Sequence, residues 1–168
     1  RTVIPWRFIN REQAMTVCQR SGKRLISAAE WYFMAGGTPD NESCNSDSGA
    51  VRTGESFNQC VSAVGVHNTV GNVWEWTSDD VIEGLYKGRS VPAEGYVTQV
   101  DGGGFPTLTG PEASGLFNAD YFWTESEGAY AIMKGGFYGS KSDAGVYSTH
   151  AATLPTSAGA AIGFRCVI

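Results

Sequence analysis

The stretch GNVWEWT at residues 71–77 carries two tryptophans at alternate positions behind a glycine. In a β-strand, Trp74 and Trp76 would point to one face of the sheet, with Glu75 between them. We interpret both tryptophans as core residues, because large aromatic side chains gain much from burial and glycine allows a close approach of the backbone. We therefore predict a short strand at residues 73–77, against which other parts of the chain pack.

Two short helices are predicted before this strand. Asn10 with Gln13, and Ser27 with Glu30, each have the spacing of a capping box, in which the two residues satisfy each other's backbone N–H groups at the start of a helix. Apolar residues then recur at helical spacing, and glycines that can end a helix follow. These glycines are Gly22, Gly36 and Gly37.

The chain has no clear helical period after these helices. Residues 73–77, 132–138 and 162–168 are typical of short strands, and glycine-rich segments separate them. We interpret residues 82–127 as an inserted loop region. Helices followed by short strands indicate an α+β fold, and a chain of 168 residues fits one domain, which we place at residues 1–168.

The composition excludes several classes of protein. Twelve Lys and Arg residues stand against 17 Asp and Glu, which gives a net charge of -5 and no basic stripe for phosphates, so we expect no nucleic-acid partner. No apolar run approaches the ~18 residues of a membrane-spanning helix, so we expect no direct membrane insertion. A hydrophobic fraction of 42% can build a core, and the 22 glycines then belong to loops and turns.

The four cysteines, which are Cys18, Cys44, Cys60 and Cys166, allow three disulfide pairings and match no metal-binding spacing. Cys44 and Cys60 flank most of a polar loop at residues 38–59. A bridge between these two would stabilise the fold by about 3 kcal/mol in the chain-entropy model. Disulfides are compatible with an oxidising, extracellular setting.

Three segments carry a family resemblance: GKRL at residues 22–25 with AEW at 29–31, GNVWEWT at 71–77, and GG at 135–136 followed by IGFRC at 162–166. In this order they resemble the formylglycine-generating enzyme (sulfatase-modifying factor) family, over roughly residues 11–168. The resemblance implies a C-type-lectin-like fold, in which two helices flank a small twisted antiparallel sheet with extensive loops. It also implies that Cys18 pairs with Cys166, which leaves Cys44 with Cys60.

The enzymes of this family use two cysteines, shortly after the Gly-Gly motif, to bind copper(I). The matching positions here are Ser140 and Gly145, and neither a hydroxyl nor a hydrogen replaces a soft thiolate on copper. We therefore predict no copper and no enzymatic activity. The alternative is an oxidoreductase of this family that has lost or changed its copper-cysteine chemistry. A triad of Ser140, Asp143 and His150 is disfavoured, because it lacks the context of a nucleophile elbow.

One metal site of the family has a counterpart in this sequence. The family holds a calcium ion with an Asn side chain, two backbone carbonyls and a Glu, and the matching residues are Asn68, Gly71, Val73 and Glu75. Hard oxygen donors of these kinds suit Ca²⁺, which would be structural here. The alternative is that Asn68 only caps the turn and Glu75 is a surface strand residue. Arg165 is interpreted as a structural residue that binds an acid or carbonyls.

The segment between Ser142 and Gly163 contains no Lys, Glu, Gln, Met or Trp. Every residue type present there can be encoded by a codon that ends in a pyrimidine, and the five missing types cannot. This pattern resembles the variable region of the proteins diversified by diversity-generating retroelements, which share the lectin-like fold and the Gly-Phe-Arg motif near its end. The sequence AGVY at residues 144–147 matches a motif of that region.

The resemblance implies a variable region at about residues 137–161. Small polar residues with interspersed Tyr and His form adaptable contact surfaces. We therefore predict a ligand-binding domain for adhesion to a protein ligand or cell-surface receptor, on a virion or a cell surface. The alternative is a low-complexity loop on a catalytically inactive homologue. The predicted ligand-binding positions are Phe137, Tyr138, Gly139, Ser140, Asp143, Tyr147, His150, Ala152, Thr153, Ser157, Gly159 and Ala161.

Overall fold

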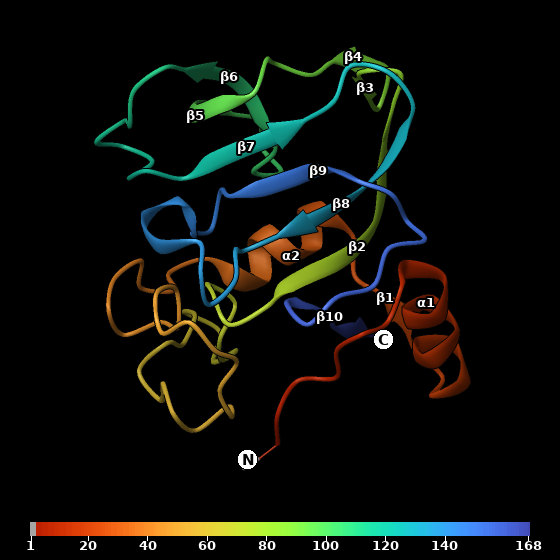
Figure 1. Cartoon of the computed structure of the whole chain (residues 1–168), viewed down its shortest axis with the longest axis vertical. Coiled ribbons are helices and arrows are strands. Elements are labelled where there is room, and N and C mark those ends of the chain that lie inside the picture. Colours follow the sequence, from red (N-terminus) through yellow and green to blue (C-terminus); the bar gives the residue numbers. More distant parts are fainter. Residues whose placement is uncertain (1–2) are drawn as a thin grey trace.

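The computed structural model of the chain describes residues 3–168, so the first two residues of the predicted domain lie outside the described part. One large curled sheet runs through the molecule, with α2 against one side and α1 at its edge (Figure 1). The helices are α1 (Arg11–Arg20) and α2 (Ala28–Ala35), and η1 (Lys141–Asp143) is a 3-10 turn. The strands are β1 (Arg24–Leu25), β2 (Trp74–Ile82), β3 (Leu85–Tyr86), β4 (Arg89–Ser90), β5 (Gly95–Val100), β6 (Pro106–Gly110), β7 (Tyr121–Thr124), β8 (Ala129–Lys134), β9 (Thr149–Thr153), β10 (Ile162–Phe164) and β11 (Cys166–Val167).

Both predicted capping boxes are present. The Asn10 side chain accepts a hydrogen bond from Gln13 N at 2.9 Å, and Asn10 N donates to Gln13 Oε1 at 3.0 Å. Ser27 and Glu30 make the same reciprocal pair at the start of α2. The two helices therefore begin where the sequence predicted, and each ends within two residues of a predicted glycine.

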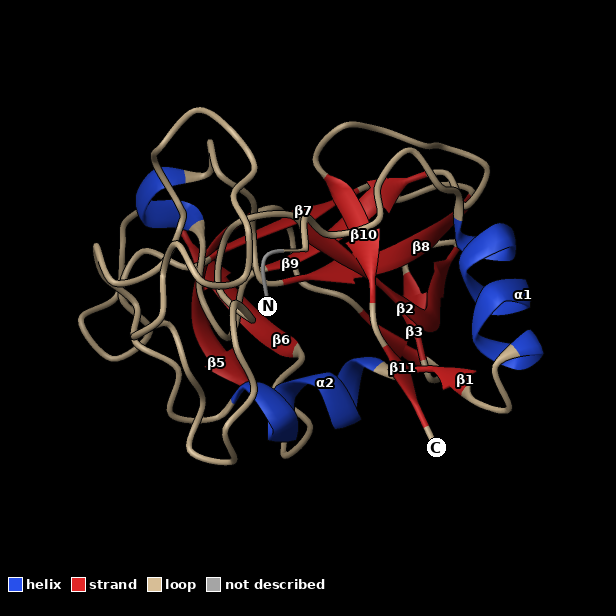
Figure 2. Cartoon of the chain, turned by 90° about the horizontal axis from the view of Figure 1, so that it is seen from below, coloured by secondary structure: helices blue, strands red, loops and turns tan. Residues whose placement is uncertain are grey.

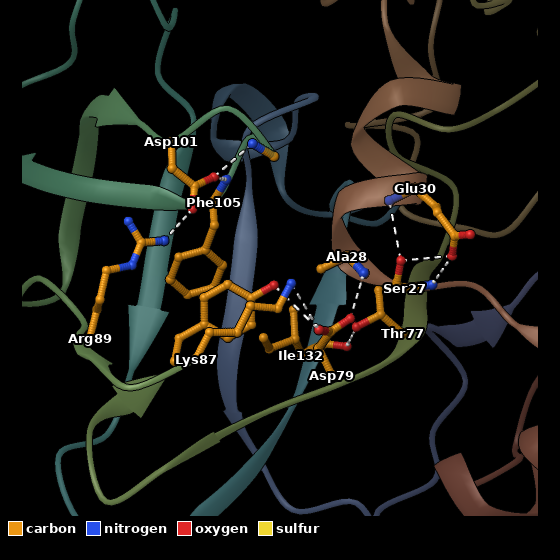
Figure 3. Close-up of polar contacts among 12 residues, drawn as sticks. Ser27, Ala28, Glu30, Thr77, Asp79, Lys87, Arg89, Asp101, Phe105 and Ile132 are labelled. Carbon is orange, nitrogen blue, oxygen red and sulfur yellow. Dashed lines mark hydrogen bonds and ion pairs between the residues drawn. The ribbon is translucent and has the colours of Figure 1, made fainter.

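Asp79 of β2 anchors the start of α2 to the sheet (Figure 3). Ala28 N donates to Asp79 Oδ2 at 2.7 Å, so a carboxylate lies at the helix N-terminus, where the helix dipole favours negative charge. The Lys87 Nζ lies 3.6 Å from Asp79 Oδ1 on the other side. The hydrogen bond from Ala28 N thus attaches α2 to β2, the strand that also carries the two tryptophans.

The main sheet has nine strands in the order β4-β3-β2-β8-β9-β7-β5-β6, with β10 beside β2. The β2–β10 and β7–β9 pairs are parallel, and the other pairs are antiparallel. The sheet is larger than the small sheet that the resemblance implied, because residues 82–127 are not an inserted loop. They form β3 to β7. These strands have two to six residues and frequent turns between them, so no period marks them in the sequence.

All three predicted strands differ in their bounds from the prediction, and β2 begins at Trp74 and β8 at Ala129. β2 continues to Ile82, five residues past Thr77. β8 ends at Lys134, because Gly135 and Gly136 adopt the left-handed conformation with φ of 94° and 84°. The segment 162–168 forms two strands, of which β10 pairs with β2 and β11 pairs with β1 (Figure 2).

The core lies on both faces of the sheet. Trp74 and Trp76 are buried in one apolar cluster with Met133 and residues of α1 on one face of the sheet, and Trp76 Nε1 donates to Ile9 O at 3.0 Å. The opposite face buries Phe122 and Ile132. Both implied disulfides are confirmed, Cys18–Cys166 with a Cα–Cα distance of 5.4 Å and Cys44–Cys60 with 4.8 Å.

Candidate functional site

The predicted variable region crosses the middle of the molecule. It leaves β8 through a turn at residues 137–148 beside the long 38–59 loop, continues as β9 between β7 and β8, and returns through residues 154–161 to β10 (Figure 1). The sequence did not indicate β9, because its residues, THAAT, are mostly small and carry no strand pattern. The region is therefore built partly on the central sheet and partly on two loops.

The residues of this region differ in burial. All twelve predicted ligand-binding positions are exposed or half-buried. The fully buried residues of 137–161 are outside that set. They are Ala144, Gly145, Ser148, Thr149 and Ala151.

His150 is the best-anchored of the predicted positions. It lies opposite Trp123 in the β7–β9 ladder, and the two rings stack with centroids 5.6 Å apart. Trp74 contacts the same imidazole from the edge, at 5.5 Å. Burial among these rings lowers the pKa of His150 to about 4, so the side chain is neutral and acts as part of an aromatic surface.

A row of aromatic rings continues from Trp123 across the sheet. Trp123 contacts Tyr121 at 4.8 Å, and Tyr121 contacts Tyr96 of β5 at 5.0 Å between ring centroids. All three side chains are half-buried. We name Tyr96, Tyr121 and Trp123 the aromatic row. The aromatic row lies outside the predicted variable region, in the segment 82–127 that the sequence analysis interprets as a loop. The alternation of Tyr121 and Trp123 with the buried Phe122 is the sequence signal that could have revealed a strand there.

The turn at residues 137–148 is held firmly by its backbone. Ser140 Oγ accepts a hydrogen bond from Phe137 N at 3.0 Å, so one predicted position also closes the turn. Tyr138 N donates to Asn72 O at 3.2 Å, and Tyr138 O accepts from Gly49 N at 3.1 Å. The turn is thus attached to both the GNVWEWT segment and the long loop.

The loop at residues 154–161 is held in a similar way by the N-terminal arm. Phe8 N donates to Gly159 O at 3.0 Å, and Arg11 N donates to Pro155 O at 3.1 Å. The side chain of Ser157 is half-buried. Apart from the hydrogen bond to the Ser140 hydroxyl, the contacts described for the two loops join main-chain atoms and do not depend on the side chains of the predicted positions.

The positions that the resemblance matches to the family's catalytic cysteines hold no thiol in this chain. Gly145 packs directly on the Asp120 carboxylate, and an ideal Cβ at Gly145 would lie 1.8 Å from Asp120 Oδ1. The other carboxylate oxygen accepts a hydrogen bond from Tyr147 N at 2.7 Å, which holds the group in place. A thiol at position 145 would therefore collide with Asp120.

The structure does not assemble a Ser-His-Asp triad. The His150 Nδ1 lies 3.3 Å from Thr153 Oγ1 and 3.4 Å from Ala152 N, and its ring is enclosed by tryptophans. Ser140 Oγ is engaged with the backbone of its own turn. The two side chains thus serve separate local contacts.

Three of the four predicted calcium ligands line one cavity of about 320 Å³. They are Asn68, Val73 and Glu75, together with Arg165, whereas Gly71 is not in the lining. Glu75 is 4% exposed, so the alternative of a surface residue is wrong. Oxygen donors of the kinds that Ca²⁺ prefers therefore lie around this cavity.

Arg165 already neutralises the carboxylate in this cavity. Its Nε donates to both carboxylate oxygens of Glu75 at 2.7 Å, and Trp31 Nε1 donates to Glu75 Oε2 at 2.7 Å. Its Nη2 donates to the carbonyls of His67 and Asn68 at 2.7 and 2.9 Å. This confirms the interpretation of Arg165, and it means that Glu75 does not need an ion to balance its charge. The calcium set stays a prediction.

The curled sheet with two helices is shared with solved structures of a C-type-lectin-like, α+β class. The Major Tropism Determinant P3c variant superposes with a TM-score of 0.59 at 22% identity, over 94% of this chain and 36% of that chain. The U1 variant gives the same values, and the M1 variant gives a TM-score of 0.59 at 20% identity with the same coverage. At these identities the likeness shows the fold, and the chain spans about a third of the length of these proteins.

Residues 2–168 match the family model described as the sulfatase-modifying factor enzyme 1-like domain. The chain belongs to this family, which confirms the resemblance carried by its three sequence segments. No curated protein matches the chain. In the described residues 3–168, the helices are too short or too polar to cross a membrane.

Proposed function

We propose that the chain is a non-enzymatic receptor-binding domain whose contact surface is diversified by a retroelement. The observation that carries this proposal is the division of residues 137–161 into a buried scaffold and half-buried or exposed predicted positions. A binding surface can vary without loss of the fold only if the varied side chains are not in the core. The solved proteins of the same fold are named tropism determinants, which supports a role in recognition of a host.

The proposed contact surface combines a variable and a constant part. His150 and Ala152 alternate with the buried Ala151 on β9, so they share the sheet face of Trp123. Aromatic rings such as the aromatic row supply large rigid contact area at low entropic cost. The proposed ligand is a protein or a cell-surface receptor, and the setting is a virion or cell surface.

The oxidoreductase alternative is supported by family membership and opposed by the geometry at Gly145. Aerobic incubation of the full chain with copper and a cysteine-containing sulfatase peptide should yield no aldehyde by mass spectrometry. Turnover of the peptide would contradict the proposal.

The binding function is tested with two displayed libraries. One randomises three predicted positions, and the other randomises three exposed positions elsewhere. Both are selected against the same panel of unrelated purified proteins. We expect specific binders only from the first library, with melting temperatures within a few degrees of the parent chain. Equal yields from both libraries would refute a dedicated surface. The first set is His150, Ala152 and Ser157, and the control set is Lys23, Glu42 and Glu112.

Diversification by a retroelement is tested separately in the neighbouring DNA. We expect a near-copy of the coding segment for residues 137–161, which differs from it at adenines and lies beside a reverse transcriptase. The absence of such a template would remove the diversification claim and leave the binding claim to the libraries.

A further inference from the structure

A second cavity, of about 330 Å³, lies at the end of the aromatic row that is farthest from His150. Its walls come from the segment before β5, from β5 itself, from the end of β6 and from the start of β7. These strands form one end of the main sheet, where β6 is the outermost strand (Figure 1). Tyr96 and Tyr121 line the cavity, and Glu94 brings a carboxylate to it. The cavity thus combines two aromatic rings with one acid.

The register of the strands explains why the cavity opens beside Tyr96. On β7, Tyr121 lies opposite Tyr96, and the two rings meet nearly at right angles, with an interplanar angle of 85°. On β6, the residue opposite Tyr96 is Gly110, which has no side chain. The Tyr96 ring is therefore packed on the side of β7, and space remains on the side of β6.

The Glu94 carboxylate is positioned by one of these tyrosines. The Tyr121 hydroxyl donates a hydrogen bond to Glu94 Oε1 at 3.3 Å. Burial, followed by the charge of Glu94, raises the pKa of Tyr121, so the hydroxyl keeps the proton that it donates. None of the ion pairs within residues 3–168 includes Glu94. The carboxylate thus lies at the cavity without a cationic partner from the described part of the chain.

The surroundings of the cavity are acidic. Residues 90–133, which include β5, β6 and β7, contain six Asp and Glu and no Lys, Arg or His. Asp143, in the turn of the predicted variable region, acts electrostatically on Tyr121. His150, at the other end of the row, is neutral. An approaching ligand therefore meets negative charge together with the faces of aromatic rings, and both attract cations.

We propose that this cavity binds an arginine side chain of the protein ligand, with the guanidinium group against the tyrosine rings and its N–H groups on Glu94. A planar guanidinium stacks on aromatic faces and offers parallel N–H donors to a carboxylate. The lining is poor in other hydrogen-bonding side chains, because the Thr109 hydroxyl is engaged with Ala93 O at 2.6 Å. This composition favours a cation over a neutral sugar, whose hydroxyls need several polar partners.

This role rests on the proposed function, because the arginine belongs to the receptor. Tyr96 lies opposite Tyr121 and His150 lies opposite Trp123, so the cavity and the variable positions on β9 share one face of the sheet. The constant cavity anchors one residue of the receptor, and the variable positions contact the surface around it.

Binding of a small guanidinium compound to the full chain tests the proposal. The probe is N-acetyl-arginine N-methylamide, and its control is the corresponding citrulline compound, which has a similar shape and no charge. Dissociation constants are measured by NMR titration for the wild type, Glu94→Gln and Tyr96→Leu. Glu127→Gln and Phe33→Leu are the matched controls, because each changes an exposed acid or an exposed aromatic ring outside the cavity.

We expect the wild type to bind the arginine compound at least fivefold more tightly than the citrulline compound, because contacts with the rings and with the carboxylate both need the positive charge. Glu94→Gln and Tyr96→Leu should each weaken binding of the arginine compound at least fivefold, and both control variants should match the wild type. Glu94 is exposed, so its variant carries the test if Tyr96→Leu does not fold.

Three results would overturn the proposal. They are the absence of detectable binding to the wild type, equal binding of the arginine and citrulline compounds, and equal binding of the arginine compound by the wild type and the cavity variants. The library selection is independent of these results, because both libraries leave Glu94, Tyr96 and Tyr121 unchanged. A failed selection would count against the proposed contact surface, and a failed titration would count against the arginine site alone.

Discussion

Substitution of Gly145 by alanine tests the packing on which both the proposed loss of catalysis and the shape of the variable turn depend. An ideal Cβ there would lie 1.8 Å from Asp120 Oδ1 and 2.4 Å from its Cγ, so the carboxylate must move. Movement breaks its hydrogen bond from Tyr147 N, and a buried group left without its partner costs about 1–3 kcal/mol. Overpacking of a filled site adds about 1–3 kcal/mol.

We therefore expect Gly145→Ala to lower the free energy of unfolding by about 3–5 kcal/mol. The assay is urea unfolding followed by tryptophan fluorescence, with linear extrapolation to water. Gly102→Ala is the matched control, because nothing lies within 4 Å of its ideal Cβ. That control should stay within about 0.5 kcal/mol of the wild type.

A double-mutant cycle with Asp120→Ala locates the effect. Once the carboxylate is gone, Gly145→Ala should cost at least about 2 kcal/mol less than it does in the wild type. The reasoning is refuted if Gly145→Ala costs under about 1 kcal/mol, or if its cost is the same in both backgrounds. Confirmation would also explain why Gly145→Cys cannot restore a copper ligand without disrupting the turn.

Four further outcomes follow from the described contacts. Burial lowers the pKa of His150 from 6.5 to about 4. Between these pH values the unfolded chain binds a proton that the folded chain does not bind. The free energy of unfolding should therefore fall by up to about 3 kcal/mol as the pH drops from about 6.5 to about 4. In His150→Phe, the free energy of unfolding measured with urea should change less with pH across this range than in the wild type. An equal pH dependence in both proteins would contradict the lowered pKa of His150. Glu75→Ala should cost about 3–5 kcal/mol in the same assay, because it leaves buried donors unpaired. Replacement of both Cys18 and Cys166 by alanine should cost about 5 kcal/mol, given their separation of 148 residues, and a loss under about 2 kcal/mol would speak against the chain-entropy account. In equilibrium dialysis, Asn68→Ala should weaken Ca²⁺ binding at the predicted family set at least tenfold, and unchanged binding would remove that set.

The sequence predicted those features that depend on near neighbours in the chain. The capping pairs at Asn10 and Ser27 span three residues, so their pattern is complete within one helical turn. The burial of Trp74 and Trp76 follows from alternation along a single strand. The likeness of three segments to a known family was specific enough to imply the fold and both disulfides.

The sequence also indicated one part of the candidate site, because the composition of a continuous segment can be read without the fold. The restricted set of residue types in 142–163 predicts a variable region without any knowledge of the fold, and in the structure none of the predicted positions is fully buried. That Tyr96 continues the row from Tyr121 and Trp123 was not predicted, because Tyr96 and Tyr121 meet through the pairing of β5 with β7, which the sequence did not reveal. Those strands have few residues, and short strands become stable only through pairing with partners far away in the chain.

What the sequence by itself determined is the family and the two helices, and the family resemblance implied the disulfide pairs. The segment that varies stays a prediction of the sequence. Only the tertiary structure decided how far the sheet extends and which side chains meet. Arg165 reaches Glu75 across 90 positions, and Asp120 fills the space at Gly145 from another loop. Such contacts depend on the mutual placement of distant segments, which a local pattern does not encode, and they are the contacts that shape both candidate sites.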